Sequence, residues 1–209
     1  IRVNMPMKRK TGIMGGTFDP IHIGHLILGE AAYDQFDLDE VWFMPAGNPP
    51  HKKNRRGRAT DSQRTEMVKR AIAGNPHFKL SLEEMNEDGY TFTYRTMEHL
   101  NKVHPNMDFY FIIGADSLLD FDTWKEPARI AGACKIVVAT RNQISRTEFD
   151  RVLEERREQF HGCFLKLDTP NLDIASKTIR GWIRNKKTTR YYLPENVRKY
   201  IIDKQIYEV

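Results

Sequence analysis

The sequence predicts an α/β fold, a doubly wound parallel sheet with a small C-terminal helical part. Short apolar runs rich in β-branched and aromatic residues alternate with segments of helical period nearly throughout the 209 residues. A glycine pair follows the first apolar run, where a helical pattern begins. From residue 170 onward the patterns are helical only. We therefore expect residues 8–209 to form a single domain, with 170–209 as its helical subregion.

Six strands and seven helices account for these patterns. The expected strands are the short apolar runs at 11–14, 41–44, 78–82, 109–113, 136–139 and 163–167. Five amphipathic helices are expected between them, at 24–36, 62–73, 93–103, 123–131 and 147–159, and two more close the chain at 176–185 and 195–204. Pro194 precedes the last helix, at a position where its missing N–H costs nothing. Strands that take turns with helices predict parallel pairing.

The composition excludes several classes of protein. Hydrophobic residues make up 40% of the chain, enough for a substantial core. No apolar run approaches the roughly 20 residues that span a bilayer, and no signal-peptide pattern opens the sequence. Cys134 and Cys163 lie in separate apolar stretches, which indicates small buried thiols rather than a disulfide. We expect a soluble, cytoplasmic protein with no membrane partner.

The charge suits an anionic ligand without identifying it. A net charge of +5 fits either nucleic acid or small phosphorylated molecules. The densest basic run, from Lys52 to Arg58, lacks the interleaved aromatic residues of a base-stacking surface. We interpret it first as a solvated loop, with a lid that grips phosphate as the alternative.

The most informative segment joins the first expected strand to the first helix and reads Gly15-Gly16-Thr17-Phe18-Asp19-Pro20-Ile21-His22-Ile23-Gly24-His25. Paired glycines let backbone N–H groups approach a phosphate, and the start of the helix directs its partial positive charge to the same place. The two histidines are three residues apart and share one helical face. A simple turn with a surface histidine pair is the alternative. Half of a zinc site is less favoured, because no third ligand is arranged nearby.

Polar residues also follow other strands of the predicted sheet. In a parallel sheet the ligand crevice lies outside the carboxyl ends of the strands, so residues that follow different strands meet at one edge. The residues at these ends are Gly15 and Gly16 after the first strand, Lys52 after the second, Gly114 and Asp116 after the fourth, and Arg141 after the fifth. Glycines, a carboxylate and basic groups at one edge predict a nucleotide phosphate site.

These residues carry a family resemblance. The segment that begins at Gly15 resembles the signature of the nucleotidyltransferase superfamily. With Asn48-Pro49-Pro50-His51-Lys52, Tyr90-Thr91-Phe92-Thr93, Gly114-Ala115-Asp116 followed by Trp124, and Ile174-Ala175-Ser176-Lys177-Thr178-Ile179-Arg180, the chain resembles the bacterial nicotinate-nucleotide adenylyltransferases. The resemblance runs from about Lys10 to the C-terminus. It implies the Rossmann-like fold of that superfamily.

The resemblance implies transfer of AMP from ATP to the phosphate of nicotinic acid mononucleotide, which gives nicotinic acid adenine dinucleotide and pyrophosphate. The implied partners are these two nucleotides, with no nucleic acid, and Mg²⁺ is carried by ATP without metal ligands from the protein. The acceptor phosphate is itself an anionic nucleophile, so the protein needs only to align it and to neutralise charge. The oligomeric state is left open, a homodimer included.

Site residues follow from the resemblance position by position. The side chains implied in the catalytic step are His22, His25, Lys52 and Arg180. Those implied for ATP are Gly15, Gly16, Thr17, Phe18, His22, His25, Gly114, Asp116, Arg141, Ser176 and Arg180. Those implied for the acceptor are Asp19, Lys52, Thr93 and Trp124. Taken alone, Thr93 would be interpreted as a helix cap and Trp124 as a half-buried core residue.

Two departures and three alternatives accompany the resemblance. One alternative is a non-catalytic nucleotide sensor, which would keep the glycines but has little use for both histidines. Ala175 and Lys177 stand where the family usually carries hydroxyl side chains, and Arg95 stands where it tends to carry aspartate. The same fold and reaction would serve another phosphorylated acceptor such as phosphopantetheine. The His-Ile-Gly-His sequence also occurs in class I aminoacyl-tRNA synthetases, for which the basic charge would indicate RNA. The acid form of the pyridine nucleotide is the expected acceptor, because its carboxylate suits a helix N-terminus.

Overall fold

The computed structural model describes residues 7–47, 57–85, 91–140 and 144–208. Within them lies a six-stranded sheet in which every neighbouring pair is parallel, in the order β3-β2-β1-β4-β5-β6. The predicted doubly wound α/β fold is therefore confirmed. The order reverses between β1 and β4, and in sheets of this kind the ligand crevice opens at that reversal.

The strands are β1 (Arg9–Gly16), β2 (Glu40–Pro45), β3 (Phe78–Leu80), β4 (Met107–Gly114), β5 (Lys135–Ala139) and β6 (Phe164–Leu167). The helices are α1 (Ile23–Gln35), α2 (Asp61–Ile72), α3 (Thr93–Val103), α4 (Ala115–Leu119), α5 (Pro127–Ala133), α6 (Arg146–Phe160), α7 (Ser176–Arg184) and α8 (Glu195–Asp203), with a 3₁₀ turn, η1 (Phe121–Thr123).

The central strands are buried on both faces, which is why they form continuous apolar runs. In β1 the side chains of Thr11, Ile13 and Met14 are buried, and Ile13 lies between Trp42 of β2 and Phe111 of β4. Successive side chains of a strand point to opposite faces of the sheet, so the sheet carries one apolar core on each face.

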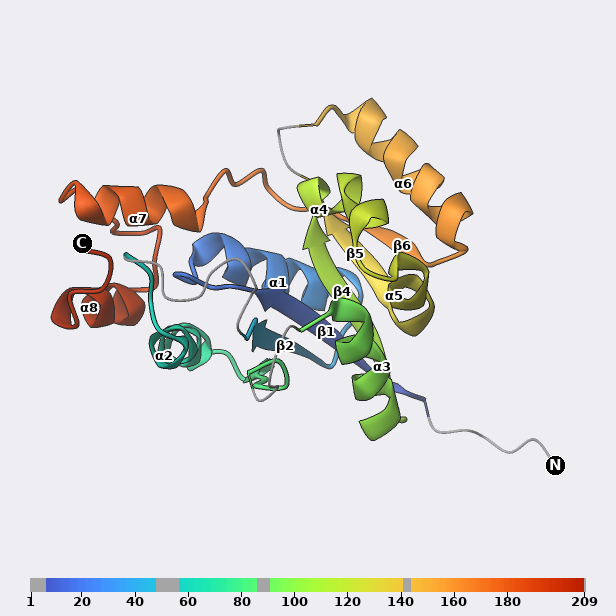
Figure 1. Ribbon diagram of the computed structural model, residues 1–209, viewed down its shortest axis with the longest axis horizontal. Helices are drawn as coiled ribbons and strands as arrows, with labels where there is room; N and C mark the ends of the chain where they lie inside the picture. Colours follow the sequence, from blue (N-terminus) through green and yellow to red (C-terminus); the bar gives the residue numbers. More distant parts are fainter. Residues whose placement is uncertain (1–6, 48–56, 86–90, 141–143, 209) are drawn as a thin grey trace.

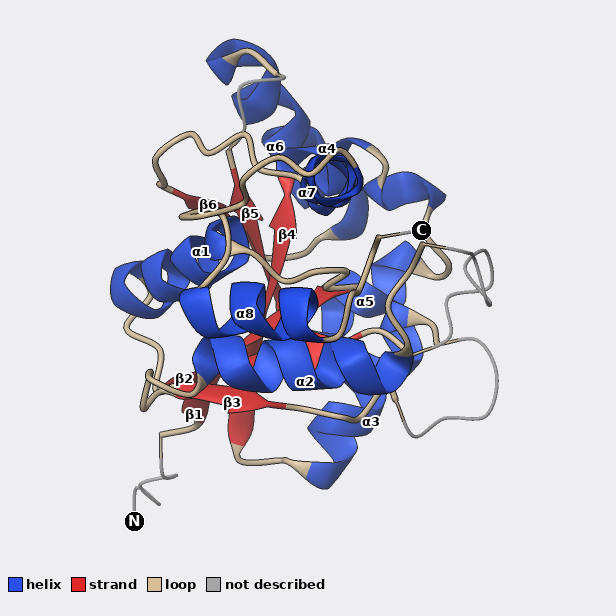
Figure 2. Cartoon of the chain, turned by 90° about the vertical axis from the view of Figure 1, so that its left-hand side faces the viewer, coloured by secondary structure: helices blue, strands red, loops and turns tan. Residues whose placement is uncertain are grey.

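Different helices cover the two faces (Figure 1). Residues of α1, α2, α7 and α8 belong to one core, and residues of α3, α4, α5 and α6 belong to the other. The C-terminal helical part shares the first core, where Ile179 and Val197 are fully buried. Figure 2 shows α8 lying alongside α2. Residues from 170 onward therefore pack on the sheet domain.

The largest differences from the sequence-based elements lie between β4 and β5. A helix was expected at 123–131, but α5 begins only at Pro127, with Glu126 before it in the left-handed region at φ 55°. A residue that precedes proline is disfavoured in the α-helical conformation, so the helix cannot run through this point. The single-turn helix α4 was not expected, because five residues are too few to establish a helical period.

The two cysteines differ from each other. Cys134 is buried as expected, and burial raises the pKa of its thiol to about 12. Cys163 is exposed, so the prediction that it is buried is wrong. It follows the turn at His161, whose φ of 48° ends α6, and precedes β6 outside the core. Both thiols are free.

None of the helices in the described part of the chain has the length and apolar character needed to span a membrane.

Helix α1 lies against the sheet at Gly29, and this contact gives a test of the packing. A Cβ added there would lie 2.9 Å from Cζ of Phe43 and 3.2 Å from Cζ of Phe78, both in the core. We expect Gly29→Ala to lower the free energy of unfolding by about 1–2 kcal/mol in denaturant titrations, because overpacking outweighs the gain in helix propensity.

Gly132→Ala is the matched control, because no atom lies within 4 Å of a Cβ built at this position in α5. It should leave stability unchanged or raise it by up to about 1 kcal/mol. Equal stability of the two variants would contradict the close packing of α1 on β2 and β3.

Candidate active site

The glycine pair lies at the carboxyl end of β1, next to the reversal of strand order. A Cβ at Gly15 would meet only the ring of Phe111, and one at Gly16 only the ring of Phe18, each at 3.4 Å. Neither glycine has a positive φ. Packing and backbone conformation therefore do not require glycine at these positions. The missing side chains leave the end of the strand accessible to a ligand.

Phe18 shapes the loop that follows. Its backbone lies in the left-handed region at φ 49°, which is uncommon for a residue with a large side chain. Its buried ring packs edge-on against His25 with centroids 5.0 Å apart. A left-handed residue in a turn directs successive backbone N–H groups into a concavity that suits an anion.

His22 and His25 form a stacked pair at the start of α1. Their ring centroids are 3.7 Å apart at an interplanar angle of 25°, and His22 is only 3% exposed. The backbone N–H of His22, the N-cap, donates to Nδ1 of His25 at 3.1 Å. Because Nδ1 accepts this bond, the neutral ring of His25 carries its proton on Nε2. His25 thus caps its own helix and keeps a donor on the opposite side of the ring.

Gly24 allows the pair to stack. A Cβ at this position would lie 3.0 Å from both Cε1 and Nδ1 of His22. The His22 ring therefore lies over the first turn of α1 only because residue 24 has no side chain.

A small cleft opens beside the histidine pair. One wall is the start of α1, and the other is the segment between β6 and α7. Oγ1 of Thr169 is buried in this wall without a hydrogen-bond partner in the described part of the chain. The lining residues are His22, Gly24, His25, Leu28, Thr140, Thr169, Pro170, Leu172 and Ile174.

Sequence reasoning missed the second wall. Residues 169–174 follow a strand, but they have no periodic pattern and no glycine turn or basic group that would mark them. Their position after β6, at the edge where the other site residues meet, was the available signal.

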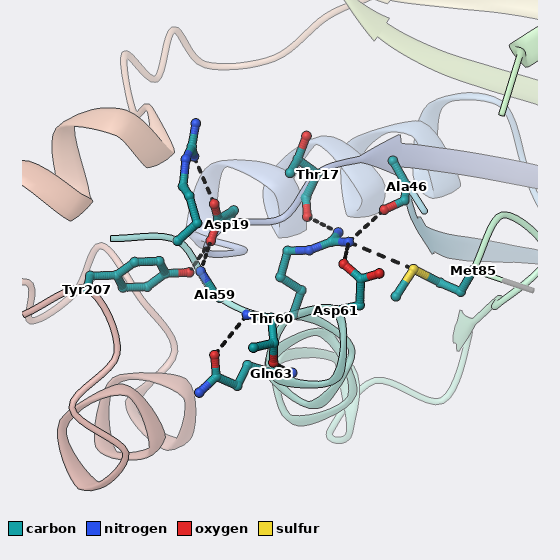
Figure 3. Close-up of polar contacts among 11 residues, drawn as sticks. Thr17, Asp19, Ala46, Ala59, Thr60, Asp61, Gln63, Met85 and Tyr207 are labelled. Atoms are coloured by element: carbon teal, nitrogen blue, oxygen red, sulfur yellow. Dashed lines mark hydrogen bonds and ion pairs between the residues drawn. The ribbon is translucent and has the colours of Figure 1, made fainter. Parts of the chain in front are cut away.

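Asp19 is held inside the protein by three donors (Figure 3). Its Oδ1 accepts from the Tyr207 hydroxyl at 2.6 Å and from the Ala59 backbone N–H at 3.1 Å, and its Oδ2 accepts from Nη1 of Arg58 at 2.8 Å. The residue is 3% exposed. In this structure the Asp19 carboxylate binds groups of the protein itself. Its contact with the pyridine nucleotide stays a prediction.

The Tyr207 hydroxyl is a permanent donor in this arrangement. Burial, and next the neighbouring Asp19 carboxylate, raise the pKa of the phenol far above its usual range. The backbone of Tyr207 is left-handed, at φ 73°. The C-terminal turn adopts this uncommon conformation, which brings the Tyr207 hydroxyl to Asp19.

Ser176 and Arg180 reach the same loop from α7. The Ser176 hydroxyl donates to the Pro20 carbonyl at 2.8 Å, and Nη1 of Arg180 donates to the Asp19 carbonyl at 2.5 Å. Burial, and next the nearby Arg58, lower the pKa of the Arg180 guanidinium. The guanidinium groups of Arg58 and Arg180 both bind Asp19, so their positive charges lie near each other and favour an anion between or beside them.

The remaining predicted residues lie at other strand ends and on the other face. Gly114 ends β4 and is the N-cap of α4, and Asp116 is exposed in the first turn of that helix. Thr93 is the first residue of α3, whose N-cap is Phe92, so Thr93 is not the cap. Trp124 is half-buried, with its ring centroid 5.4 Å from that of Phe121. Lys52 and Arg141 lie outside the described residues.

The described residues contain no group of three or more His, Cys, Asp or Glu side chains placed to hold a metal ion. A divalent ion carried on a triphosphate would be bound through phosphate oxygens and water, which needs no such group.

Comparison with known proteins identifies the family. The cytidylyltransferase-like family model matches residues 13–182. A protein of Desulfitobacterium hafniense (strain DSM 10664 / DCB-2), named "Probable nicotinate-nucleotide adenylyltransferase", is 39% identical over 209 residues, the full length of both chains. The chain belongs to the nicotinate-nucleotide adenylyltransferase family. A protein of the same name from Thermoanaerobacter sp. (strain X514) is also 39% identical, over 98% of this chain and 97% of its own.

The resemblance drawn from the motifs is therefore confirmed. Among solved structures, the nicotinic acid mononucleotide adenylyltransferase of Plasmodium falciparum complexed with NaAD has the same fold, with a TM-score of 0.78 at 21% identity over 96% of this chain and 98% of that one. The same Plasmodium enzyme complexed with APC gives a TM-score of 0.75. At this identity the likeness concerns the fold.

The hydrogen bond between Tyr207 and Asp19 predicts a loss of stability on its removal. Tyr207→Phe keeps the buried ring and deletes only the hydroxyl, so we expect the free energy of unfolding at neutral pH to fall by about 1–2 kcal/mol in denaturant titrations. Tyr200→Phe, a half-buried tyrosine of α8 whose ring lies under Arg70, should change it little.

The difference in the free energy of unfolding between the wild type and Tyr207→Phe should also depend on pH. The pKa of the buried phenol lies above that of the unfolded chain, so this stability is fully present below about pH 10 and is lost as the pH rises further. The gap between wild type and Tyr207→Phe should shrink above that pH. A constant gap would show that the hydroxyl is not buried as described.

Proposed function

We propose that this chain transfers AMP from ATP to the phosphate of nicotinic acid mononucleotide and releases pyrophosphate and nicotinic acid adenine dinucleotide, a step of NAD biosynthesis. The observation that carries the proposal is the stacked His22–His25 pair beside a cleft at the end of β1, in a chain that matches nicotinate-nucleotide adenylyltransferases over their full length.

No side chain is required as a nucleophile in this reaction. An oxygen of the acceptor phosphate attacks the α-phosphorus of ATP, and the bond from that phosphorus to the oxygen that leaves with pyrophosphate breaks. The protein contributes alignment and stabilisation of the charge that builds up on the phosphoryl oxygens. His25, with its donor on Nε2, and the adjacent His22 are suited to contact those oxygens. We include Lys52 and Arg141 in this role by resemblance.

The start of α7 suits the remaining phosphates of ATP. Arg180 uses Nη1 on the Asp19 carbonyl, and a guanidinium has five N–H donors in all. The departure at Ala175 is informative here, because this residue is the N-cap of α7 and its side chain makes no capping bond. The N–H groups of the first turn are then available to an anion, with the charge of Lys177 close by. Mg²⁺ bound to the triphosphate would neutralise part of its charge.

The acceptor would lie on the side of the second core. Thr93 begins α3, where the helix N-terminus favours the nicotinate carboxylate, and Trp124 offers a half-exposed ring for stacking on the pyridine. This placement supports a preference for the acid over the amide form. Asp116, exposed at the end of β4, is suited to ribose hydroxyls. We have no physical account of Arg95.

The acceptor is tested by pyrophosphate release with Mg-ATP. We expect turnover with nicotinic acid mononucleotide and a kcat/KM at least about tenfold lower with nicotinamide mononucleotide, because the amide lacks the charge that the helix N-terminus favours. Phosphopantetheine should give none. Turnover only with phosphopantetheine would identify that compound as the acceptor in place of nicotinic acid mononucleotide. ATP binding without turnover on any of the three compounds would contradict the proposed reaction, and binding of tRNA would be measured next.

Two substitutions of His25 distinguish the roles of its two ring nitrogens. His25→Asn keeps an acceptor near the position of Nδ1, so the start of α1 should stay intact, but it removes the donor at Nε2. We expect kcat for pyrophosphate release to fall about 100-fold or more, with little change in the free energy of unfolding. His25→Gln, which can place an N–H near the position of Nε2, should retain more activity. A fully active His25→Asn would remove the histidine from the chemistry.

A further inference from the structure

Arg64 is a buried cation that the mechanism above does not use. It lies in the first turns of α2 and is 3% exposed. Its Nη1 donates to the Thr17 carbonyl at 2.6 Å, and its Nη2 donates to the Ala46 carbonyl at 2.8 Å and to Oδ1 of Asp61 at 2.7 Å. Figure 3 shows these three partners around one guanidinium.

The carbonyls of Thr17 and Ala46 lie directly after the ends of β1 and β2, where the two strands separate. The last hydrogen bond between these two strands runs from the Ala46 N–H to the Gly16 carbonyl at 2.8 Å. Beyond it, Arg64 binds the carbonyls of both Thr17 and Ala46. A guanidinium can do this because its donors form a rigid fork, whereas the single ammonium of lysine cannot span two acceptors in the same way.

The Thr17 carbonyl fixes the direction of a neighbouring N–H group. In a planar trans peptide the C=O of Thr17 and the N–H of Phe18 point in opposite directions. Figure 3 shows the carbonyl directed toward α2 and the side chain of Thr17 directed away from it. The Phe18 N–H is therefore directed away from α2. No acceptor within the described residues receives it.

We propose that Arg64 is a positioning residue for the phosphates of ATP: it holds the Thr17–Phe18 peptide so that the Phe18 N–H donates to a phosphate oxygen. The left-handed φ of Phe18, the accessible end of β1 and the nearby guanidinium of Arg180 place this N–H at the anion site described above. The inference rests on the proposed function.

The position of Arg64 is itself fixed by the start of α2. Thr60 and Gln63 form a reciprocal cap, in which each side chain accepts from the other's backbone N–H at 3.1 and 2.9 Å. This cap sets the first turn of the helix one residue before Arg64. The orientation of the Thr17–Phe18 peptide is thus built into the fold before any ligand binds.

The test compares binding of ATP and of adenosine by titration calorimetry. Arg64→Lys keeps the charge but cannot hold both carbonyls. We expect the Kd for ATP to rise about tenfold, the loss of about one charge-assisted hydrogen bond, while the Kd for adenosine stays within about twofold. Arg70→Lys is the matched control on the same helix, where the arginine pairs with Glu66 at the surface, and it should leave both affinities unchanged.

Equal weakening of ATP and adenosine binding would overturn the proposal, because general damage to the loop does not distinguish the phosphates. Unchanged ATP affinity would overturn it as well. Neither measurement needs turnover, so failure of the acceptor assay would remove the proposed function without deciding the role of Arg64.

A measurement on the wild-type chain covers the case in which Arg64→Lys does not fold. The amide resonance of Phe18, followed by ¹H–¹⁵N NMR, should shift on titration with inorganic triphosphate, and the amide of Leu165 in β6 should not. A Phe18 resonance that stays in place at saturation would refute the proposal.

Discussion

The burial of one carboxylate organises this molecule. An ionised group taken out of water must find donors within the protein, and Asp19 finds them in Arg58, in the Ala59 backbone and in Tyr207. These donors come from the segment before α2 and from the turn after α8, so the loop between β1 and α1, helix α2 and the C-terminal part are joined at Asp19. Arg180 and Ser176 bind the carbonyls of Asp19 and Pro20 from α7. The loop thus has its shape from contacts on three sides, all made by the protein itself.

The predicted site residues lie on both faces of the sheet. The histidine pair, Ser176 and Arg180 belong to the layer of α1 and α7, whereas Thr93 and Trp124 lie over the second core with α3 and α5. The glycine pair at the end of β1 lies between these two sets, beside β4, where strand order reverses. An in-line transfer places the attacking oxygen and the leaving oxygen on opposite sides of one phosphorus. A parallel sheet with a helical layer on each face supplies two such sides at one strand end.

Much of the fold could be predicted because the central strands are buried on both faces and the longer helices have a clear apolar period. The elements at 93–103 and 136–139 are right to within a residue, and the histidine pair does share one face of α1. Arg64 and Tyr207 could not be predicted as residues that shape the site. Arg64 binds backbone carbonyls, which leave no trace in the residue types, and Tyr207 finds its partner 188 residues away. The helix expected from residue 123 begins instead at Pro127, because a residue that precedes proline is disfavoured in the α-helical conformation.

The separation of Asp19 and Tyr207 has a consequence for biosynthesis. Synthesis of the intervening 188 residues takes roughly 10 to 40 s at ribosomal rates of about 5–20 residues per second. Throughout this interval the nascent chain contains Asp19 but lacks the phenol that satisfies it, and α7 and α8 are also missing for most of that time. The sheet strands nearest the N-terminus can pair earlier, since β1, β2 and β4 are complete by residue 114. These three strands can therefore pair during translation, whereas the loop that contains Asp19 acquires its final hydrogen bonds only after Tyr207 has left the ribosome.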